Sequence, residues 1–223
     1  SRVLVRSNPD RPVPVFERPA PTRRTEPRLV EAYAPNVPLP AIAAIYPGVA
    51  ANHPDAAALD VLAGIMSRGE SSRLYQSLVY GSQLASGAFL SAGSMEEAGT
   101  VTVNVTLAQG KSIVDAETAL DVELERIRNE PVTAAELAEA KMEIVASELR
   151  QRETASGRAF ILGQALVSEN DPAAPDAHLS AVQAVTAADV QRVARTYLNE
   201  QARVSIRYQD ESQIGRASCR ERV

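Results

Sequence analysis

Hydrophobic and polar positions alternate most regularly between Thr100 and Leu107, and this run predicts a β-strand. Val101, Val103 and Val105 share one face of such a strand, whereas threonine and asparagine occupy the other. The preceding run, QLASGAFLSAGS, also has strand character, and the turn-forming segment GSMEEAG lies between the two. Together the two runs predict an antiparallel pair.

Short apolar runs next to proline predict two further strands, RLVEAYA (28–34) and PAIAAIYPG (40–48). A last run, RVSIRY (203–208), predicts a strand that closes the domain. Helical patterns dominate the second half of the chain. Strands first, then helices, then a final strand are typical of an α+β fold, in which an antiparallel β-sheet has helices packed on one face.

Several segments carry the i, i+3, i+4 spacing of apolar residues that predicts amphipathic helices. Pro54 marks the start of the first helix, Gly69 ends it, and a further helix begins near Ser71. The residues expected to face the core are Leu59, Leu62 and Met66; Ile113, Leu120, Leu124 and Ile127; Ala138, Met142, Val145 and Leu149; and Val190, Val193, Ala194 and Tyr197.

Two helix starts carry the same sequence device. Thr133 with Glu136, and Thr186 with Asp189, have the spacing of a capping box, in which each side chain binds the other residue's backbone N–H. Each cap stabilises its helix by about 1 kcal/mol. The repeated VTAA motif therefore indicates two similar helix starts and not a solenoid repeat.

The two ends of the chain differ from the domain between them. Six of the 14 prolines lie in the first 27 residues, so residues 1–26 predict an extended interdomain linker, with a disordered leader as the alternative. Residues 214–223 show no periodicity and resemble the translation of a sequencing adapter, so we expect a non-native tail, with a natural basic tail as the alternative. The domain is expected to span residues 27–213.

Composition and charge exclude several classes of partner. The chain has 223 residues and a formal net charge of −5, but its two ends are basic, so residues 27–213 carry −10. An acidic body without clustered Lys or Arg argues against nucleic acid as the main partner.

No run approaches the ~18 apolar residues of a membrane span. Cys219, the only cysteine, lies in the expected tail, which excludes a disulfide framework or thiolate metal site in the domain. The compartment, periplasmic or cytoplasmic, stays open.

Candidate catalytic side chains are few. The two histidines, His53 and His178, are 125 positions apart, and neither lies in an HExxH or HxxEH motif. His53 falls in a turn before a helix and His178 in an Asp- and Pro-rich connection, so both are expected to be exposed or locally hydrogen-bonded. The chain has no G-x-G-x-x-G, Walker or G-x-S-x-G motif. The residues therefore predict no catalytic group, metal ligand or cofactor within this chain.

Three stretches resemble a known family when they are taken in order. They are HPDAAALDVLAGIMSRGESSRLYQSLVYGSQLAS (53–86), VTAAELAEAKMEI (132–144) and VTAADVQRVARTYL (185–198). They are similar to the C-terminal half of bacterial M16 metallopeptidases, the family of insulinase, pitrilysin and the mitochondrial processing peptidase. The resemblance covers residues 27–209 and implies the M16/LuxS-like metallohydrolase fold.

The resemblance also implies where the chemistry of such proteins lies. Family members hold zinc through HxxEH and a distal Glu in an N-terminal domain, and this chain lacks that motif. It would then be a gene fragment holding the non-metal domain of a zinc metalloendopeptidase, which shapes a peptide-holding chamber. The implied partners are an N-terminal metal-bearing domain of the same chain, a second M16-type subunit and a peptide substrate. The alternative is a non-catalytic scaffold or partner subunit, and an upstream HxxEH motif would separate the two.

Two residues are candidates for substrate binding. Family members hold the peptide backbone and the developing oxyanion through an Arg and a Tyr that are seven residues apart. Arg73 and Tyr80 have this spacing, about two α-helical turns, which would place both on one face. Alignment of S-R-L-Y with the family's S-R-L-[FY] element instead moves the pair to Val79 and Ser86, which lack the required groups. In that favoured register, Arg73 belongs to the helix start and its packing.

Overall fold

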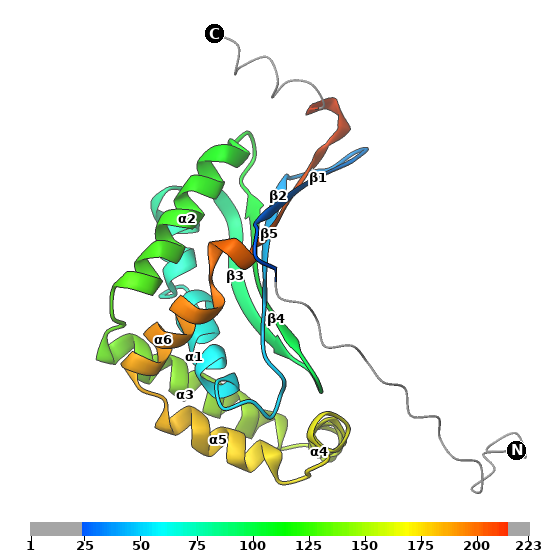
Figure 1. Cartoon of the computed structure of the whole chain (residues 1–223), viewed down its shortest axis with the longest axis vertical. Coiled ribbons are helices and arrows are strands. Elements are labelled where there is room, and N and C mark those ends of the chain that lie inside the picture. The colour runs from blue at the N-terminus through cyan, green and yellow to red at the C-terminus, as the bar shows by residue number, and fades with distance from the viewer. Residues whose placement is uncertain (1–23, 214–223) are drawn as a thin grey trace, which may run out of the picture.

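The computed structural model of the protein describes residues 24–213, and it has the predicted α+β architecture (Figure 1). The strands are β1 (Arg28–Ala34), β2 (Ala41–Pro47), β3 (Ala85–Ser94), β4 (Gly99–Leu107) and β5 (Val204–Asp210). The α-helices are α1 (Ala56–Ser67), α2 (Ile113–Asn129), α3 (Ala134–Gln151), α4 (Ala155–Glu169), α5 (Ala174–Ala184) and α6 (Ala187–Tyr197). A π-helix spans Tyr75–Gly81, and single 3₁₀ turns span Glu200–Ala202 and Glu211–Gln213.

The five strands form one sheet in the order β1-β5-β2-β4-β3. The predicted hairpin of β3 and β4 is confirmed, and β2 pairs antiparallel with both β4 and β5. The pair β1–β5 is parallel, which departs from the expected wholly antiparallel sheet. These two strands lie at opposite ends of the domain's sequence, so no tight turn joins them and either strand direction is available.

The helices cover one face of the sheet, and the core lies between the two layers (Figure 1). Val101, Val103 and Val105 of β4 are fully buried beneath the helices, as the alternation predicts. The helix α1 contacts β3, α3, α5 and α6, and it buries residues on nearly every side rather than on one stripe. Its alanine-rich sequence suits this central position because small side chains let neighbouring elements approach closely.

The start of α3 is confirmed, but its predicted buried stripe is wrong. Both capping boxes form, at Thr133 and at Thr186, and the predicted stripe of α6 is buried. In α3, however, Ala140 and Ile144 face the core, whereas Met142 is 67% and Leu149 is 54% exposed. A Cβ placed on Gly64 of α1 would lie 3.2 Å from the Ala140 Cβ. This close approach of two small residues fixes the rotation of α3 and leaves its larger side chains outside.

Further expectations concern His178, the two ends of the chain and a membrane span. His178 lies within α5 and not in a connection, so that expectation is wrong. Most of the expected linker 1–26 and all of the expected tail 214–223 lie outside the described residues. Within residues 24–213, no helix combines the length and apolar character needed to cross a membrane.

Candidate functional site

The segment that carries both candidate substrate-binding residues is not an ordinary α-helix. After α1 ends, Gly69 takes a φ of +74°, and the chain re-enters helical conformation at Arg73. From Tyr75 to Gly81 it forms a π-helix, in which the Ser82 N–H donates to the Ser77 carbonyl at 3.0 Å. Single-turn π-helices are rare and occur often at functional sites. This geometry makes the segment a candidate functional site.

The side chain of Arg73 is largely enclosed and forms a two-point ion pair. Its side chain is 9% exposed, and its Nε and Nη2 donate to the two carboxylate oxygens of Glu136 at 2.7 and 3.2 Å. Glu136 also accepts hydrogen bonds from the Thr133 N–H and hydroxyl, at 2.7 and 2.8 Å. The carboxylate therefore caps α3 and ties it to the start of the π-helix. The Arg73 guanidinium and these capping bonds lower the pKa of Glu136 to about 2.

A second carboxylate lies near this pair. Glu123 of α2 is 3% exposed, and burial raises the pKa of its carboxyl. The positive charges of Arg126 and Arg73 act in the opposite direction. Among residues 24–213, neither Oε1 of Glu123 nor Nη1 of Arg73 has a hydrogen-bond partner. The guanidinium is thus paired with Glu136 of α3, and its charge also acts on the buried Glu123 of α2.

Tyr80 lies in a different environment from Arg73. It is 72% exposed, so the two side chains do not share a face. A π-helical turn closes by i→i+5 hydrogen bonds, so seven residues fall short of two turns and the expected alignment of the pair is lost. In the favoured register, which places the pair at Val79 and Ser86, Val79 is half-buried, and the Ser86 hydroxyl donates to the backbone oxygens of Thr106 and Leu107 at 3.2 Å.

The two histidines have different partners, one close in the sequence and one on another helix. His53 accepts a hydrogen bond at Nδ1 from the Asp55 backbone N–H at 3.0 Å, which matches its expected place in a helix-start turn. His178 Nε2 lies 3.1 Å from Asp60 Oδ2, and this interaction raises the pKa of the imidazole. Over residues 24–213, no three His, Cys, Asp or Glu side chains are grouped closely enough to hold a metal ion. These side chains therefore do not fit the zinc that the family resemblance implies for the full assembly.

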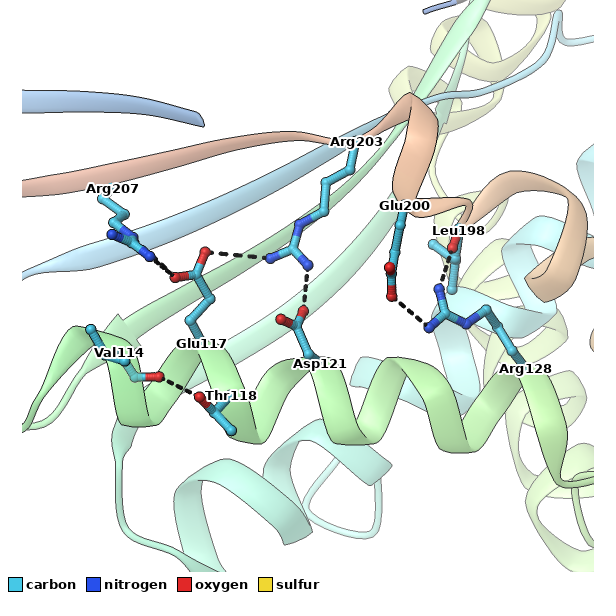
Figure 2. Close-up of polar contacts among 9 residues, drawn as sticks. All are labelled: Val114, Glu117, Thr118, Asp121, Arg128, Leu198, Glu200, Arg203 and Arg207. Atoms are coloured by element: carbon cyan, nitrogen blue, oxygen red, sulfur yellow. Dashed lines mark hydrogen bonds and ion pairs between the residues drawn. The ribbon is translucent and has the colours of Figure 1, made fainter. Parts of the chain in front are cut away.

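The largest described cavity, about 580 Å³, lies between α2 and the β5–β1 edge of the sheet. Figure 2 shows the ion pairs along it. Arg207 donates from Nε to Glu117 Oε2 at 3.0 Å, and Arg203 Nη2 lies 3.7 Å from Glu117 Oε1. Arg203 also donates to Asp121, and Arg128 donates to Glu200 at 3.2 Å.

This cluster joins β5 to α2 and has the character of a structural contact. Each carboxylate that lines the cavity is already paired with an arginine, so none of them is a free general base. None of these residues was predicted as part of a site. Their signal was the spacing: Arg203 and Arg207 fall on one face of a strand, and Glu117 and Asp121 are one helical turn apart.

Solved structures share this fold. A protease from Helicobacter pylori matches with a TM-score of 0.84 and 22% identity over 91% of this chain and 48% of that chain. The inactive peptidase domain of a proposed zinc protease from Bordetella parapertussis matches with a TM-score of 0.69 and 28% identity over 76% of this chain and 92% of the other. A peptidase M16 inactive domain from Pseudomonas fluorescens matches with a TM-score of 0.73 and 20% identity, over 88% and 46%.

The protein thus spans about half the length of the Helicobacter and Pseudomonas chains. No curated protein matches it. The family model described as "Peptidase M16 inactive domain" matches residues 4–144, more than half of the chain. The fold, the order of the S-R-L-Y segment and the two capping-box helices, and this match agree. The chain belongs to the M16 peptidase family, as an M16 inactive domain.

Proposed function

We propose that this domain is the non-metal part of an M16-type zinc metalloendopeptidase, where it forms one wall of a peptide-holding chamber. The observation that carries the proposal is the match of residues 4–144 to the M16 inactive domain. The Bordetella parapertussis structure, an inactive domain of a proposed zinc protease, supports it at 28% identity. In this proposal, a companion domain supplies the zinc and the glutamate that activates water for peptide hydrolysis.

The side chains of this domain suit a supporting role. Arg73 donates two hydrogen bonds to Glu136, which supports a role in holding α3 against the π-helix. Tyr80 is exposed and remains available as a peptide contact. Without Arg73 beside it, the ring would contribute apolar surface and one hydroxyl, and it would not stabilise an oxyanion together with a guanidinium.

Zinc binding and peptide cleavage test the proposal. Residues 1–213 alone are expected to bind no stoichiometric zinc in a calorimetric titration and to cleave no peptide. The full-length polypeptide with its companion domain is expected to bind zinc and to cleave. Tight zinc binding by residues 1–213 would overturn the proposal. A companion domain that lacks HxxEH and binds no zinc would instead identify a non-catalytic scaffold subunit.

A further inference from the structure

We propose that the outer face of α4 is a docking surface for the companion domain of the same polypeptide; this inference rests on the proposed function. The α4 face consists of Phe160, Leu162, Leu166 and Val167, which are 63%, 49%, 53% and 74% exposed. Of the 15 residues of α4, only Ala165 is buried.

The pattern of α4 is the reverse of that of a normal surface helix. On a 3.6-residue helix, the four large side chains share their side with Ala159 and Gly163, and together they span about half of the circumference. No charged residue lies within this arc. Arg158 and Glu169 border this arc on the side of Leu162 and lie close to Ala165, the buried contact. A surface helix usually turns charge outward and apolar residues inward, so this arrangement indicates a covered face.

The helix is well defined at both ends, so its exposure does not reflect fraying. Thr154 accepts a hydrogen bond from the Gly157 N–H at 3.0 Å, and Asn170 ends the helix with a φ of 54°. On its inner side α4 packs on α5, and a hollow that Phe160 also lines lies between α4 and Ser94, at the end of β3. The α4 face is therefore held in place as one continuous apolar surface before any partner binds.

Other exposed apolar residues do not form such a surface. Val114 and Val122 of α2 are 56% and 61% exposed, but two turns separate them and charged residues lie between them. Single exposed aliphatic residues are ordinary on protein surfaces, whereas contiguous apolar patches mark interaction sites. In Figure 1, α2 lies at the opposite end of the helical layer from α4, so these two valines provide a matched control.

The length of the related chains indicates what covers the α4 face. Three structural matches include 91%, 88% and 87% of this chain, but only 48%, 46% and 44% of the other chain in each match. Each of them therefore contains about as much polypeptide again beyond the shared fold. A domain tethered by a linker has a high effective concentration, so a modest apolar patch is enough to hold it. An uncharged face also fits an apolar domain surface better than a charged peptide.

Amide hydrogen exchange tests whether the α4 face is covered in the full-length polypeptide. Amides of residues 155–169 should exchange at least tenfold more slowly in the full-length polypeptide than in residues 1–213 alone. The double variant Leu162→Glu/Leu166→Glu should leave the melting temperature of residues 1–213 within about 2 °C, because both side chains are exposed. In the full-length polypeptide it should abolish the extra protection. The control Val114→Glu/Val122→Glu should retain it.

Three outcomes would overturn the inference: equal exchange in the two proteins, equal loss of protection in both double variants, or protection of α4 by dimerisation of residues 1–213. The last outcome would identify a second copy as the occupant. None of these measurements uses zinc or cleavage. The docking surface can therefore fail while the proposed function stands, and an inactive polypeptide can still show a protected α4.

Discussion

Arg73 and Glu136, 63 positions apart in the sequence, form a two-point ion pair with N–O distances of 2.7 and 3.2 Å. The same carboxylate caps α3 through Thr133. One acid therefore fixes both the first turn of α3 and the entry to the π-helix. This geometry gives the arginine of the S-R-L-Y segment a structural task, whichever register the family alignment takes.

Replacement of Arg73 by alanine is expected to lower the free energy of unfolding by about 2–3 kcal/mol. Hydrogen bonds to charged groups contribute about 1.5–3 kcal/mol, and the half-buried Glu136 would lose both of them. Denaturant unfolding of residues 1–213 measures the change. Arg150→Ala is the matched control, because Arg150 is exposed on α3 and has no ion-pair partner within residues 24–213. Unchanged stability combined with a large fall in peptide turnover of the full assembly would assign Arg73 to the substrate instead.

Tyr80→Ala should change the free energy of unfolding by less than about 0.5 kcal/mol, since the ring is 72% exposed. Tyr80 and Arg73 face different surroundings. The changes in the free energy of unfolding caused by Arg73→Ala and Tyr80→Ala should therefore add within about 0.5 kcal/mol in the double variant. A double-mutant cycle measured on peptide binding to the full assembly tests the same point. A coupling energy above 1 kcal/mol there would show that the two residues act as a pair.

Much of this fold follows from local sequence signals. The alternation in β4, the glycine break after α1 and the two Thr-led capping boxes each gave an element at the right place. These features depend on a few neighbouring residues, so no tertiary contact had to be known. The sequence also assigned the chain to its family, and the match to the M16 inactive domain confirms this.

Other features depend on contacts that no local pattern contains. The rotation of α3 is set by the approach of Ala140 to Gly64, two residues with little apolar surface of their own. The insertion of β5 between β1 and β2 requires strands from both ends of the domain. The π-helix changed the relation of Arg73 to Tyr80, because spacing alone assumes 3.6 residues per turn. The large apolar side chains of α4 follow helical spacing, but spacing alone does not show that they are exposed rather than turned to the core.

Acidification should expose the contribution of Glu136. Its pKa falls from 4.5 to about 2 on folding, chiefly through the Arg73 hydrogen bond. A lowered folded-state pKa means that the stabilisation is present above pH 4.5 and is lost as the pH falls towards 2. Since the side chain is 28% exposed, we expect about 1–2 kcal/mol, less than the full shift would give.

Unfolding curves of the parent protein and Glu136→Gln between pH 2 and 7 measure this contribution. The difference in the free energy of unfolding between the two proteins should be constant above pH 5 and should shrink below it. Glu125→Gln, the same substitution at an exposed residue of α2, is the matched control. If the difference in the free energy of unfolding between the parent protein and Glu136→Gln does not vary with pH, the ion pair does not contribute as expected.

The contact of α5 with α1 should weaken with rising pH through His178. Its Nε2 lies 3.1 Å from Asp60 of α1, and this hydrogen bond raises the pKa of the imidazole above 6.5, with smaller contributions from Glu148 of α3 and Glu169 of α4. A raised folded-state pKa means that the stabilisation is complete below pH 6.5 and is lost as the pH rises through the folded-state value. The stability difference between the parent protein and Asp60→Asn should therefore be largest near pH 6 and smallest near pH 9.

In Asp60→Asn, NMR titration of the His178 ring should give a lower pKa. Glu153→Gln, an exposed change beyond the end of α3, should leave that titration unchanged. An equal His178 pKa in the parent and in Asp60→Asn would show that the two side chains do not interact.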